Sequence, residues 1–437
     1  MTDDASRGPA GTSVAGRPAE HDPEPAILRD GAEAEAYVAS VCFKHGPPRL
    51  LGAELEWLLE RPAEPQSPID AGTLRAALGA HTPTTLDPTS PALPLPGGST
   101  VTLEPGGQVE LASPPLPDLA ALLQTAQADA AVLHRMLSAS GLQPQPRAAE
   151  PVRPPARILD IPRYRAMEQV FDRAGPFGRS AMSSTAAVQV CVDAGDGDAD
   201  ITRRWAAVHA VGPVLLAAFA NSPRLHGRRT GWKSSRWACW MRADPARTAP
   251  PPLEDVTAAD PGSAWARRVL HSPVLCVRAD DGWYVPERMT FAEWIEGALP
   301  VPPTVSDLDY HISTLFPPVR PHGHLEVRYV DGQAGRRWAL PIAVLATLLS
   351  HPDTTDMARE ACEAAQGRWV AAARHGLADR VLARAAATLF SLACARVASL
   401  GAPGWVVEDL ISMTEQQVLC GRCPADDPPG PTAPGPE

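Results

Sequence analysis

Four separated segments of the chain alternate apolar residues with acidic or amide residues, as strands do when one face of their sheet is buried. These segments are Leu51–Leu59, Gln108–Ala112, Ala187–Asp193 and His324–Val330. In the first segment Glu54 and Glu56 lie on the same face, because consecutive side chains on a strand point to opposite sides. The pattern therefore predicts a sheet with one apolar face and one acidic face.

The polar residues of the other strands extend this acidic face. Gln108 and Glu110 share the polar side of the second segment. The polar side of the fourth carries His324, Glu326 and Arg328. Carboxylates gathered on one face repel one another unless a cation lies between them, and hard oxygen ligands favour Mg2+ or Mn2+. Four such strands together predict a metal site for nucleotide chemistry, whereas each strand alone would be typical of a solvated sheet face.

The sequence lacks the usual phosphate-binding loops, so we expect a nucleotide to be held by metals and arginines. Lys233 follows Gly231 and Trp232 in a segment that resembles the end of such a loop, but no glycine directly precedes the lysine. The surrounding segment, 221–236, is dense in Arg, Ser, Thr and Gly and indicates an anion-binding loop. In it, the planar guanidinium of Arg236 suits a two-pronged clamp on a carboxylate. A solvated surface loop is the alternative for this composition.

A second polar segment surrounds the fourth strand. Arg320, Glu326 and Arg328 fall on one side of it. His322, His324 and Glu326 alternate in a way that would also suit zinc, although histidines in such a pattern more often serve structure. Both interpretations of the histidines stay open at this point.

Length and charge limit the classes of partner. At 437 residues the chain is long enough for one large domain or two closely joined ones. Its formal net charge of -11 disfavours nucleic acids and anionic membranes, because both need a basic surface. Small molecules are the expected ligands. We expect no apolar run to be long enough to cross a bilayer, and the opening segment has no hydrophobic signal region, so a cytoplasmic location is expected.

Strands come early in the chain and helices late, which predicts an α+β fold. Helices are expected over 31–43, 116–140 and 203–219, and through most of the chain after residue 342. Residues 1–26 and 424–437 are rich in Pro, Gly, Asp and Ala and are predicted to be disordered tails.

Two smaller features complete the pattern. The eight cysteines form no compact framework, which indicates reduced thiols. Cys420 and Cys423 form a C-x-x-C pair that would suit a redox pair or half of a zinc site, without a second pair to support either. Asp307 and Asp309 are expected to cap a helix.

Five short motifs, found in this order, resemble those of the glutamate-cysteine ligases. They are Gly52–Glu56, Pro105–Ser113, Met182–Asp193, Asn221–Pro223 and Thr314–Arg328. The resemblance is to the plant and actinobacterial branch of that family. Within the branch, the chain is most similar to the actinobacterial enzymes that supply γ-glutamylcysteine for ergothioneine synthesis.

The resemblance implies a glutamine-synthetase-like catalytic domain over residues 27–423, in which a curved antiparallel sheet flanked by helices forms a funnel. It implies ATP as a cofactor together with about two or three Mg2+ ions, for which Mn2+ can substitute. The implied metal ligands are Glu54, Glu56, Glu110 and Glu326, with Glu104 and Gln189 as weaker candidates. The implied catalytic residues, which would hold the glutamate carboxylate or the charge on phosphate, are Arg236, Arg328 and Arg320. The predicted nucleotide contacts are Arg236 and Arg328, together with Lys233 from the segment that resembles the end of a phosphate-binding loop.

The implied reaction is ATP-dependent ligation of the γ-carboxylate of L-glutamate to the amine of L-cysteine through a γ-glutamyl phosphate. A ligase of the same fold with a different amine acceptor is the nearest alternative. A magnesium-dependent phosphohydrolase is another. A catalytically silent relative is disfavoured, because none of the four principal carboxylates is missing. The sequence leaves the oligomeric state open and slightly favours a monomer.

Overall fold

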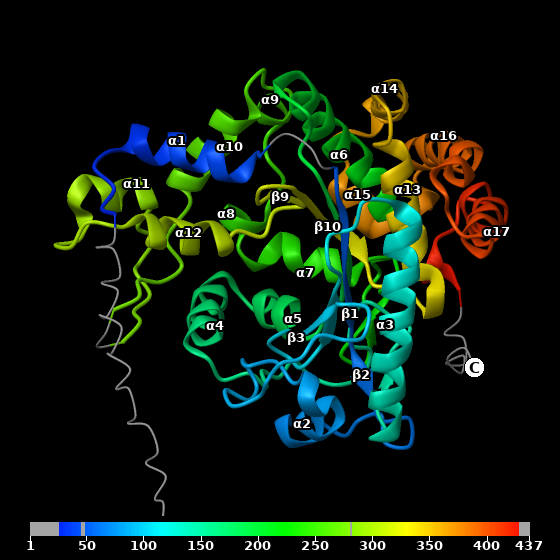
Figure 1. The fold of residues 1–437 in the computed structure, drawn as a ribbon, viewed down its shortest axis with the longest axis horizontal. Coiled ribbons are helices and arrows are strands. Elements are labelled where there is room, and N and C mark those ends of the chain that lie inside the picture. The colour runs from blue at the N-terminus through cyan, green and yellow to red at the C-terminus, as the bar shows by residue number, and fades with distance from the viewer. Residues whose placement is uncertain (1–25, 45–48, 280–281, 428–437) are drawn as a thin grey trace, which may run out of the picture.

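A six-stranded antiparallel sheet lies at the centre of the computed structural model, which describes residues 26–44, 49–279 and 282–427 (Figure 1). The strand order is β3-β4-β1-β6-β10-β9, so the sheet is open, with β3 and β9 at its edges. The strands are β1 (Leu51–Trp57), β3 (Thr100–Leu103), β4 (Val109–Ala112), β6 (Ala187–Val192), β9 (Val319–Pro321) and β10 (Leu325–Asp331). The predicted α+β fold, with a glutamine-synthetase-like antiparallel sheet flanked by helices, is confirmed.

The four segments predicted as strands are β4, β1, β6 and β10, which are consecutive neighbours in the sheet. Glu56 lies opposite Glu110 on β4, and Glu54 lies opposite Gln189 on β6. Residues directly opposite each other in an antiparallel pair point to the same side of the sheet. The register therefore gathers the polar residues of separate strands on one face.

Strand β10 contains one irregularity. Its register against β6 shifts by one residue between Val327 and Val330, as in a β-bulge. Asp331 consequently lies opposite Ala187, on the face of the sheet that also carries Gln189. Uninterrupted alternation from Val327 would have turned Asp331 to the apolar face instead.

Three helices cover the apolar face of the sheet. Helices α3, α6 and α13 contact β1, β10 and β6, respectively. Their bounds are Leu119–Ala139, Asp198–Ala218 and Ala339–Leu348. Leu55 and Val190 on this face are fully buried, and the hydroxyl of Tyr329 donates to the carbonyl of Val208 in α6 at 3.2 Å. The apolar half of the strand pattern thus forms the core of the protein.

The remaining helices surround this core (Figure 1). Three of them contribute residues to the polar side of the sheet: α4 (Pro162–Ala174), α5 (Phe177–Ser183) and α7 (Ser235–Ala243). The C-terminal layer consists of α14 (Pro352–Ala361), α15 (Trp369–His375), α16 (Arg380–Arg396) and α17 (Gly404–Met413). The others are α1 (Gly31–Cys42), α2 (Ala71–Leu78), α8 (Pro245–Thr248), α9 (Leu253–Val256), α10 (Pro261–His271), α11 (Phe291–Glu293) and α12 (Val305–Ser313).

Two predicted elements have different bounds. The strand predicted over 51–59 ends at Trp57, and a separate short strand, β2 (Leu59–Glu60), pairs with β5 (Gln143–Pro144). The helix predicted over 203–219 begins earlier, at Asp198, because acidic residues in a first turn are stabilised by the helix dipole. A further two-stranded hairpin is formed by β7 (Arg224–Leu225) and β8 (Arg228–Arg229).

The prediction of a helix cap at residues 307–309 is confirmed for one of its two aspartates. Asp307 completes a capping box at the start of α12, where it exchanges hydrogen bonds with Thr304. Asp309 instead accepts a hydrogen bond from the hydroxyl of Tyr37 at 2.8 Å.

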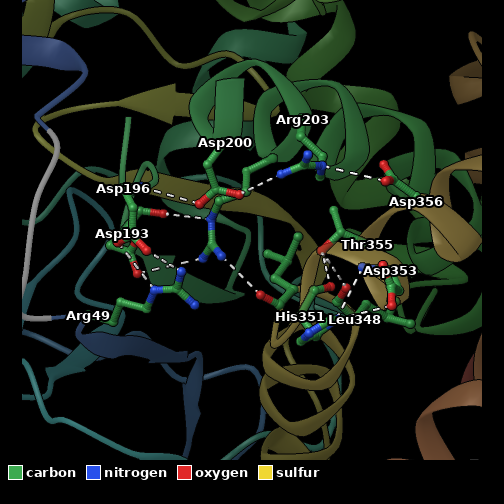
Figure 2. A network of polar contacts seen from close by, with 12 residues as sticks. Arg49, Asp193, Asp196, Asp200, Arg203, Leu348, His351, Asp353, Thr355 and Asp356 are labelled. Atoms are coloured by element: carbon green, nitrogen blue, oxygen red, sulfur yellow. Dashed lines mark hydrogen bonds and ion pairs between the residues drawn. The ribbon is translucent and has the colours of Figure 1, made fainter. Parts of the chain in front are cut away.

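An acidic segment between β6 and α6 is neutralised by arginines (Figure 2). Asp196 pairs with Arg49, and Asp200 accepts from Arg203 at 3.1 Å. Arg203 also lies 3.5 Å from Asp356 at the start of α14. These contacts connect the end of a central strand to two helices, so the aspartates serve the fold.

One helix is an exception to the expectation that no apolar run is long enough to cross a bilayer. Helix α16 and the turn after it, Arg380–Leu400, are long and apolar enough to cross a bilayer by length and composition alone. Leu382, Leu389 and Phe390 on this helix are fully buried, and the helix contacts α6 and α13. A core helix of this kind passes the same test, so the segment is weak support for a membrane span.

The described chain continues to residue 427, four residues beyond the predicted domain boundary. The backbone N–H of Ala425 donates to the carbonyl of Ala220 at 2.9 Å, and Arg147 donates to the carbonyl of Pro424 at 2.8 Å. The start of the predicted C-terminal tail is therefore packed on the loop that follows α6. The predicted N-terminal tail, apart from its last residue, and residues 428–437 lie outside the described residues.

We expect Gly212→Ala to lower the free energy of unfolding by about 1–3 kcal/mol, measured by urea titration. A Cβ atom on Gly212, in the middle of α6, would lie 2.2 Å from the ring of Trp369. Gly404→Ala is the control, because a Cβ atom there meets nothing within 4 Å. Equal stability of the two variants would contradict this close packing.

Candidate active site

The polar face of the sheet borders a cavity of about 250 Å3. Strands β1, β4, β6 and β10 supply one wall, and helices α4, α5 and α7 supply the other. The charged residues that line it are Glu54, Glu56, Glu104, Glu110, Arg163, Arg236, Arg320 and Arg328. The sequence-predicted carboxylates and arginines therefore meet in one place, with the exceptions described below.

Three of the carboxylates form a compact group. Carboxylate oxygens of Glu56, Glu104 and Glu110 all lie within 4.8 Å of one another. Glu104 comes from the tight turn between β3 and β4, which is closed by hydrogen bonds between Glu104 and both Gln108 and Gly107. The turn needs its glycines: Gly107 has a φ of +83°, and a Cβ atom on Gly106 would lie 2.3 Å from a backbone oxygen.

Burial and mutual repulsion make these carboxylates reluctant to ionise. Burial raises the pKa of Glu110 to about 7, with a further contribution from Glu56. Burial and then the charge of Glu110 raise the pKa of Glu54 to about 8. The pKa of Glu104 lies well above its ordinary value, mainly through burial and then through Glu110 and Glu56. A dication between the carboxylates would remove this repulsion.

The donor set of this group fits a magnesium ion. All of its ligand atoms are carboxylate oxygens, which suit a small hard cation, and the three residues line the cavity. Among the described residues this is the one group of three or more such side chains close enough to share an ion. His322 and His324 are not part of it, so the zinc alternative gains no support.

Glu326 has different partners from the other carboxylates. Its Oε2 accepts from Arg320 Nε at 2.7 Å, and its Oε1 accepts from both Arg320 and Arg328. Burial alone would raise its pKa, but the two arginines outweigh burial and lower the pKa to about 2. Both oxygens are thus occupied by guanidinium groups, and metal ligation by Glu326 stays a prediction that requires these pairs to open.

Gln189 connects the carboxylate group to the arginines. Its amide nitrogen donates to Glu56 Oε1 at 2.7 Å, and its amide oxygen accepts from Arg328 at 2.5 Å. A neutral amide can do both at once because it carries a donor and an acceptor. Its predicted role as a weak metal ligand is not tested by this arrangement.

Arg236, which lines the cavity, has side-chain donors without a partner among the described residues. It lies in the first turn of α7, whose N-terminus is capped by the side chain of Ser234, and it is only 4% exposed. Its Nη2 donates to the carbonyl of Arg328 at 2.7 Å. Its Nε and Nη1 have no hydrogen-bond partner among the described residues. A buried guanidinium with two free donors beside a cavity favours an anionic ligand.

A sequence model of glutamate-cysteine ligase family 2 matches residues 50–427 of this chain. The chain belongs to this family. It is 38% identical over 417 residues to the glutamate-cysteine ligase EgtA of Mycobacterium tuberculosis, covering 93% of this chain and 91% of the relative. It is 41% identical over 341 residues to EgtA of Mycolicibacterium smegmatis, covering 76% and 78% of the two chains. The resemblance found in the sequence is confirmed, and so is the prediction of an enzyme, a ligase of this family.

Two more distant similarities concern a plant enzyme and a solved structure. The chloroplastic glutamate-cysteine ligase of Medicago truncatula is 32% identical over 264 residues, covering 56% of this chain and 49% of the relative. The crystal structure of glutamate-cysteine ligase from Francisella tularensis in complex with AMP has a similar fold. Its TM-score is 0.50 at 13% identity, with 88% of this chain and 84% of that chain covered, so this likeness concerns the fold alone.

Lys233 lies elsewhere in this ligase than its sequence prediction implied. Its ammonium group forms an ion pair with Asp426, and it is not among the residues that line the cavity. Its backbone N–H donates to the carbonyl of Ala373 at 3.0 Å. These contacts hold the loop before α7 and give no support to a nucleotide contact.

Several cavity residues were not predicted from the sequence as site residues, among them Arg163, Tyr164, Trp240 and Phe316. Phe316 lies inside the motif Thr314–Arg328, so the motif could have identified it as a candidate site residue. Arg163 and Tyr164 lie in the first turn of α4, and nothing in their spacing distinguishes them from other helix residues. The prediction of reduced thiols is confirmed, since all eight cysteines are free, and Cys423 is buried.

Metal-free protein is expected to lose stability as the pH rises from about 6.5 to about 8, because burial raises the pKa of Glu110 to about 7 and that of Glu54 to about 8. The folded state then holds protons that the unfolded state has released, so its free energy of unfolding falls with pH. Below pH 6.5 buried histidines give the opposite slope, since burial lowers the pKa of His134 and His209 to about 4.

Thermal unfolding with and without Mg2+ measures this effect. Mg2+ should raise Tm more at the upper end of the pH range, where it no longer competes with protons. Glu110→Gln should flatten the pH dependence of the metal-free protein. A Tm shift by Mg2+ that is independent of pH would contradict the carboxylate group as the metal site.

Proposed function

We propose that this protein joins the γ-carboxylate of L-glutamate to the amine of L-cysteine at the expense of ATP, giving γ-glutamylcysteine, ADP and phosphate. The observation that carries the proposal is the pairing, in one cavity, of a three-carboxylate group with a buried arginine that has two free donors. The first suits the metal ions of a nucleotide, and the second suits the anionic groups of an amino acid or a phosphate. The names of the mycobacterial relatives support the choice of substrates.

The chemistry requires activation of a carboxylate. An oxygen of the glutamate γ-carboxylate attacks the γ-phosphorus of ATP, and ADP leaves. The amine of cysteine then attacks the carbonyl of the resulting acyl phosphate, phosphate leaves, and the amine loses a proton. In these two reaction steps the protein positions the substrates and stabilises their charges, and no covalent bond to the enzyme is needed.

Glu56, Glu104 and Glu110 would hold Mg2+, with Glu54 beside them. When bound, Mg2+ neutralises charge on the phosphate oxygens of ATP. Gln189 keeps Glu56 in place and at the same time orients Arg328. The carboxylates and the arginines are therefore held at a fixed separation before any substrate arrives.

The arginines would stabilise the anions of the reaction. Arg236 would donate from Nε and Nη1 to a carboxylate or a phosphoryl oxygen, since these two groups have no partner among the described residues. Arg320 and Arg328 form ion pairs with Glu326, which fix their positions in the lining of the cavity. A guanidinium that is already oriented stabilises developing charge without reorganisation.

We further propose that the product serves ergothioneine synthesis in the cytoplasm. The support is the similarity of most of the chain to the two mycobacterial EgtA enzymes. A ligase with a different amine acceptor is the alternative.

Phosphate release and product mass test the proposed function. Purified protein with ATP and Mg2+ is given glutamate alone, glutamate with cysteine, or glutamate with other amines. Cysteine-dependent release together with the mass of γ-glutamylcysteine is expected. Faster phosphate release with another amine would identify that amine as the acceptor in place of cysteine. Phosphate release without any amino acid would indicate a phosphohydrolase.

Glu104→Gln is expected to lower kcat by at least about a hundredfold, because it removes one ligand charge from the metal group. The same change should leave Tm of the metal-free protein unchanged or higher, since it relieves repulsion with Glu110 and Glu56. Glu64→Gln is the control, because Glu64 is exposed and does not line the cavity. Wild-type kcat in Glu104→Gln would contradict the proposed metal site.

Arg236→Lys is expected to lower kcat/KM for glutamate by about tenfold to a hundredfold. Lysine provides a single ammonium group in place of the guanidinium fork and cannot also reach the carbonyl of Arg328. Arg229→Lys, on the exposed strand β8, is the matched control. If both variants have the same kcat/KM, Arg236 does not hold an anionic substrate.

A further inference from the structure

We propose that Asp331 is a positioning residue for the ligase reaction, whose buried carboxylate fixes Arg236 and the loop before it against the sheet. The inference rests on the proposed function, because it assigns its effect through Arg236. Asp331 is the last residue of β10 and is fully buried. It belongs to none of the five sequence motifs and does not line the cavity.

Both oxygens of Asp331 accept hydrogen bonds from the loop between α6 and α7. Oδ2 accepts from the backbone N–H of Asn221 at 2.9 Å and from the hydroxyl of Ser222 at 2.7 Å. Oδ1 accepts from the hydroxyl of Ser234 at 2.8 Å. These donors come from the two ends of the loop, so one carboxylate closes the loop onto the end of β10.

The same hydroxyl groups hold the backbone around Arg236. The hydroxyl oxygen of Ser222 accepts from the backbone N–H of Arg236 at 3.1 Å. The hydroxyl oxygen of Ser234 caps α7 by accepting from the backbone N–H of Trp237 at 3.0 Å. Each serine thus donates to Asp331 and accepts from the first turn of α7. The position of this turn depends on the carboxylate.

Asp331 also compensates the charge of Arg236. Its Oδ1 lies 3.8 Å from Nη1 of Arg236, which is close enough for attraction but too long for a hydrogen bond. A buried guanidinium needs a nearby negative charge. The carboxylate satisfies this need without a hydrogen bond to Nε or Nη1, so both donors have no partner among the described residues.

The bulge in β10 makes this arrangement possible. It places Asp331 opposite Ala187, on the polar side of the sheet, behind the arginine. Without the extra residue the carboxylate would face the apolar core, where no loop or arginine could pair with it. The irregularity in the strand therefore has a direct consequence for the site.

A double-mutant cycle tests the proposal. Wild type, Asp331→Asn, Arg236→Lys and the double variant are compared for kcat and for the KM of glutamate, cysteine and ATP. Asp331→Asn keeps the size of the side chain and is expected to lower kcat/KM for glutamate about tenfold. It should change the same kinetic parameter as Arg236→Lys, and its effect should disappear in the Arg236→Lys background, because the two residues act as a unit. Additive effects would overturn the proposal.

Asp129→Asn is the matched control. Asp129 is also fully buried and accepts from the backbone N–H groups of Gly97 at 2.7 Å and Ser99 at 3.0 Å, but it does not line the cavity. It should lower Tm and leave kcat and all KM values unchanged. If Asp331→Asn gives the same result as Asp129→Asn, Asp331 is structural only and the proposal is wrong.

A second variant covers the case in which Asp331→Asn does not fold. Ser222→Ala removes the bridge between Asp331 and the backbone of Arg236, and should change the same kinetic parameter by a smaller factor. Unchanged kinetics in folded Ser222→Ala would overturn the proposal. If wild type forms no γ-glutamylcysteine, the proposed function is wrong instead. The same cycle is then measured by calorimetric binding of L-glutamate and ATP, where additivity again overturns the role of Asp331.

Discussion

Burial of like charges on one face of a sheet is the constraint on which the rest of this structure depends. Carboxylates from β1 and β4 and from the turn between β3 and β4 lie so close together that burial and repulsion raise the pKa values of Glu54, Glu104 and Glu110. A fold can keep such a group only if bound protons or cations compensate the charge. Here the compensation is divided: Glu326 is paired with arginines inside the protein, and the other carboxylates are suited to a metal ion.

This division gives the cavity two kinds of charged group. The carboxylates of the compact group form no ion pair among the described residues, whereas Arg320 and Arg328 are held by Glu326. Gln189 joins the two groups through its donor and its acceptor. The reaction proposed here needs both groups, since a nucleotide brings phosphates with their metals and an amino acid brings carboxylates. The helices on the apolar face contribute indirectly, because they hold the strands from which these side chains project.

The sequence predicted the strands of the site well and the individual roles less completely. Alternation along a strand is local, so the polar face of β1 and β4 could be assigned from the residues alone. Glu104 was harder, because it lies in a turn where alternation does not apply, and it became a weak candidate although it belongs to the compact group. Lys233 was predicted to contact the nucleotide by analogy with a loop, but its partner, Asp426, is almost two hundred residues away in the chain.

By itself the sequence determined which side chains share a face of each strand, the α+β class of the fold and the family to which the chain belongs. The reason is that strand periodicity and short motifs are properties of neighbouring residues. Only the tertiary structure decided which carboxylates meet a guanidinium and which do not, because those contacts depend on the register between strands. It also decided the side on which Asp331 lies: a one-residue bulge in β10 reverses the alternation there, and a bulge is set by pairing with β6 rather than by the residues of β10 alone.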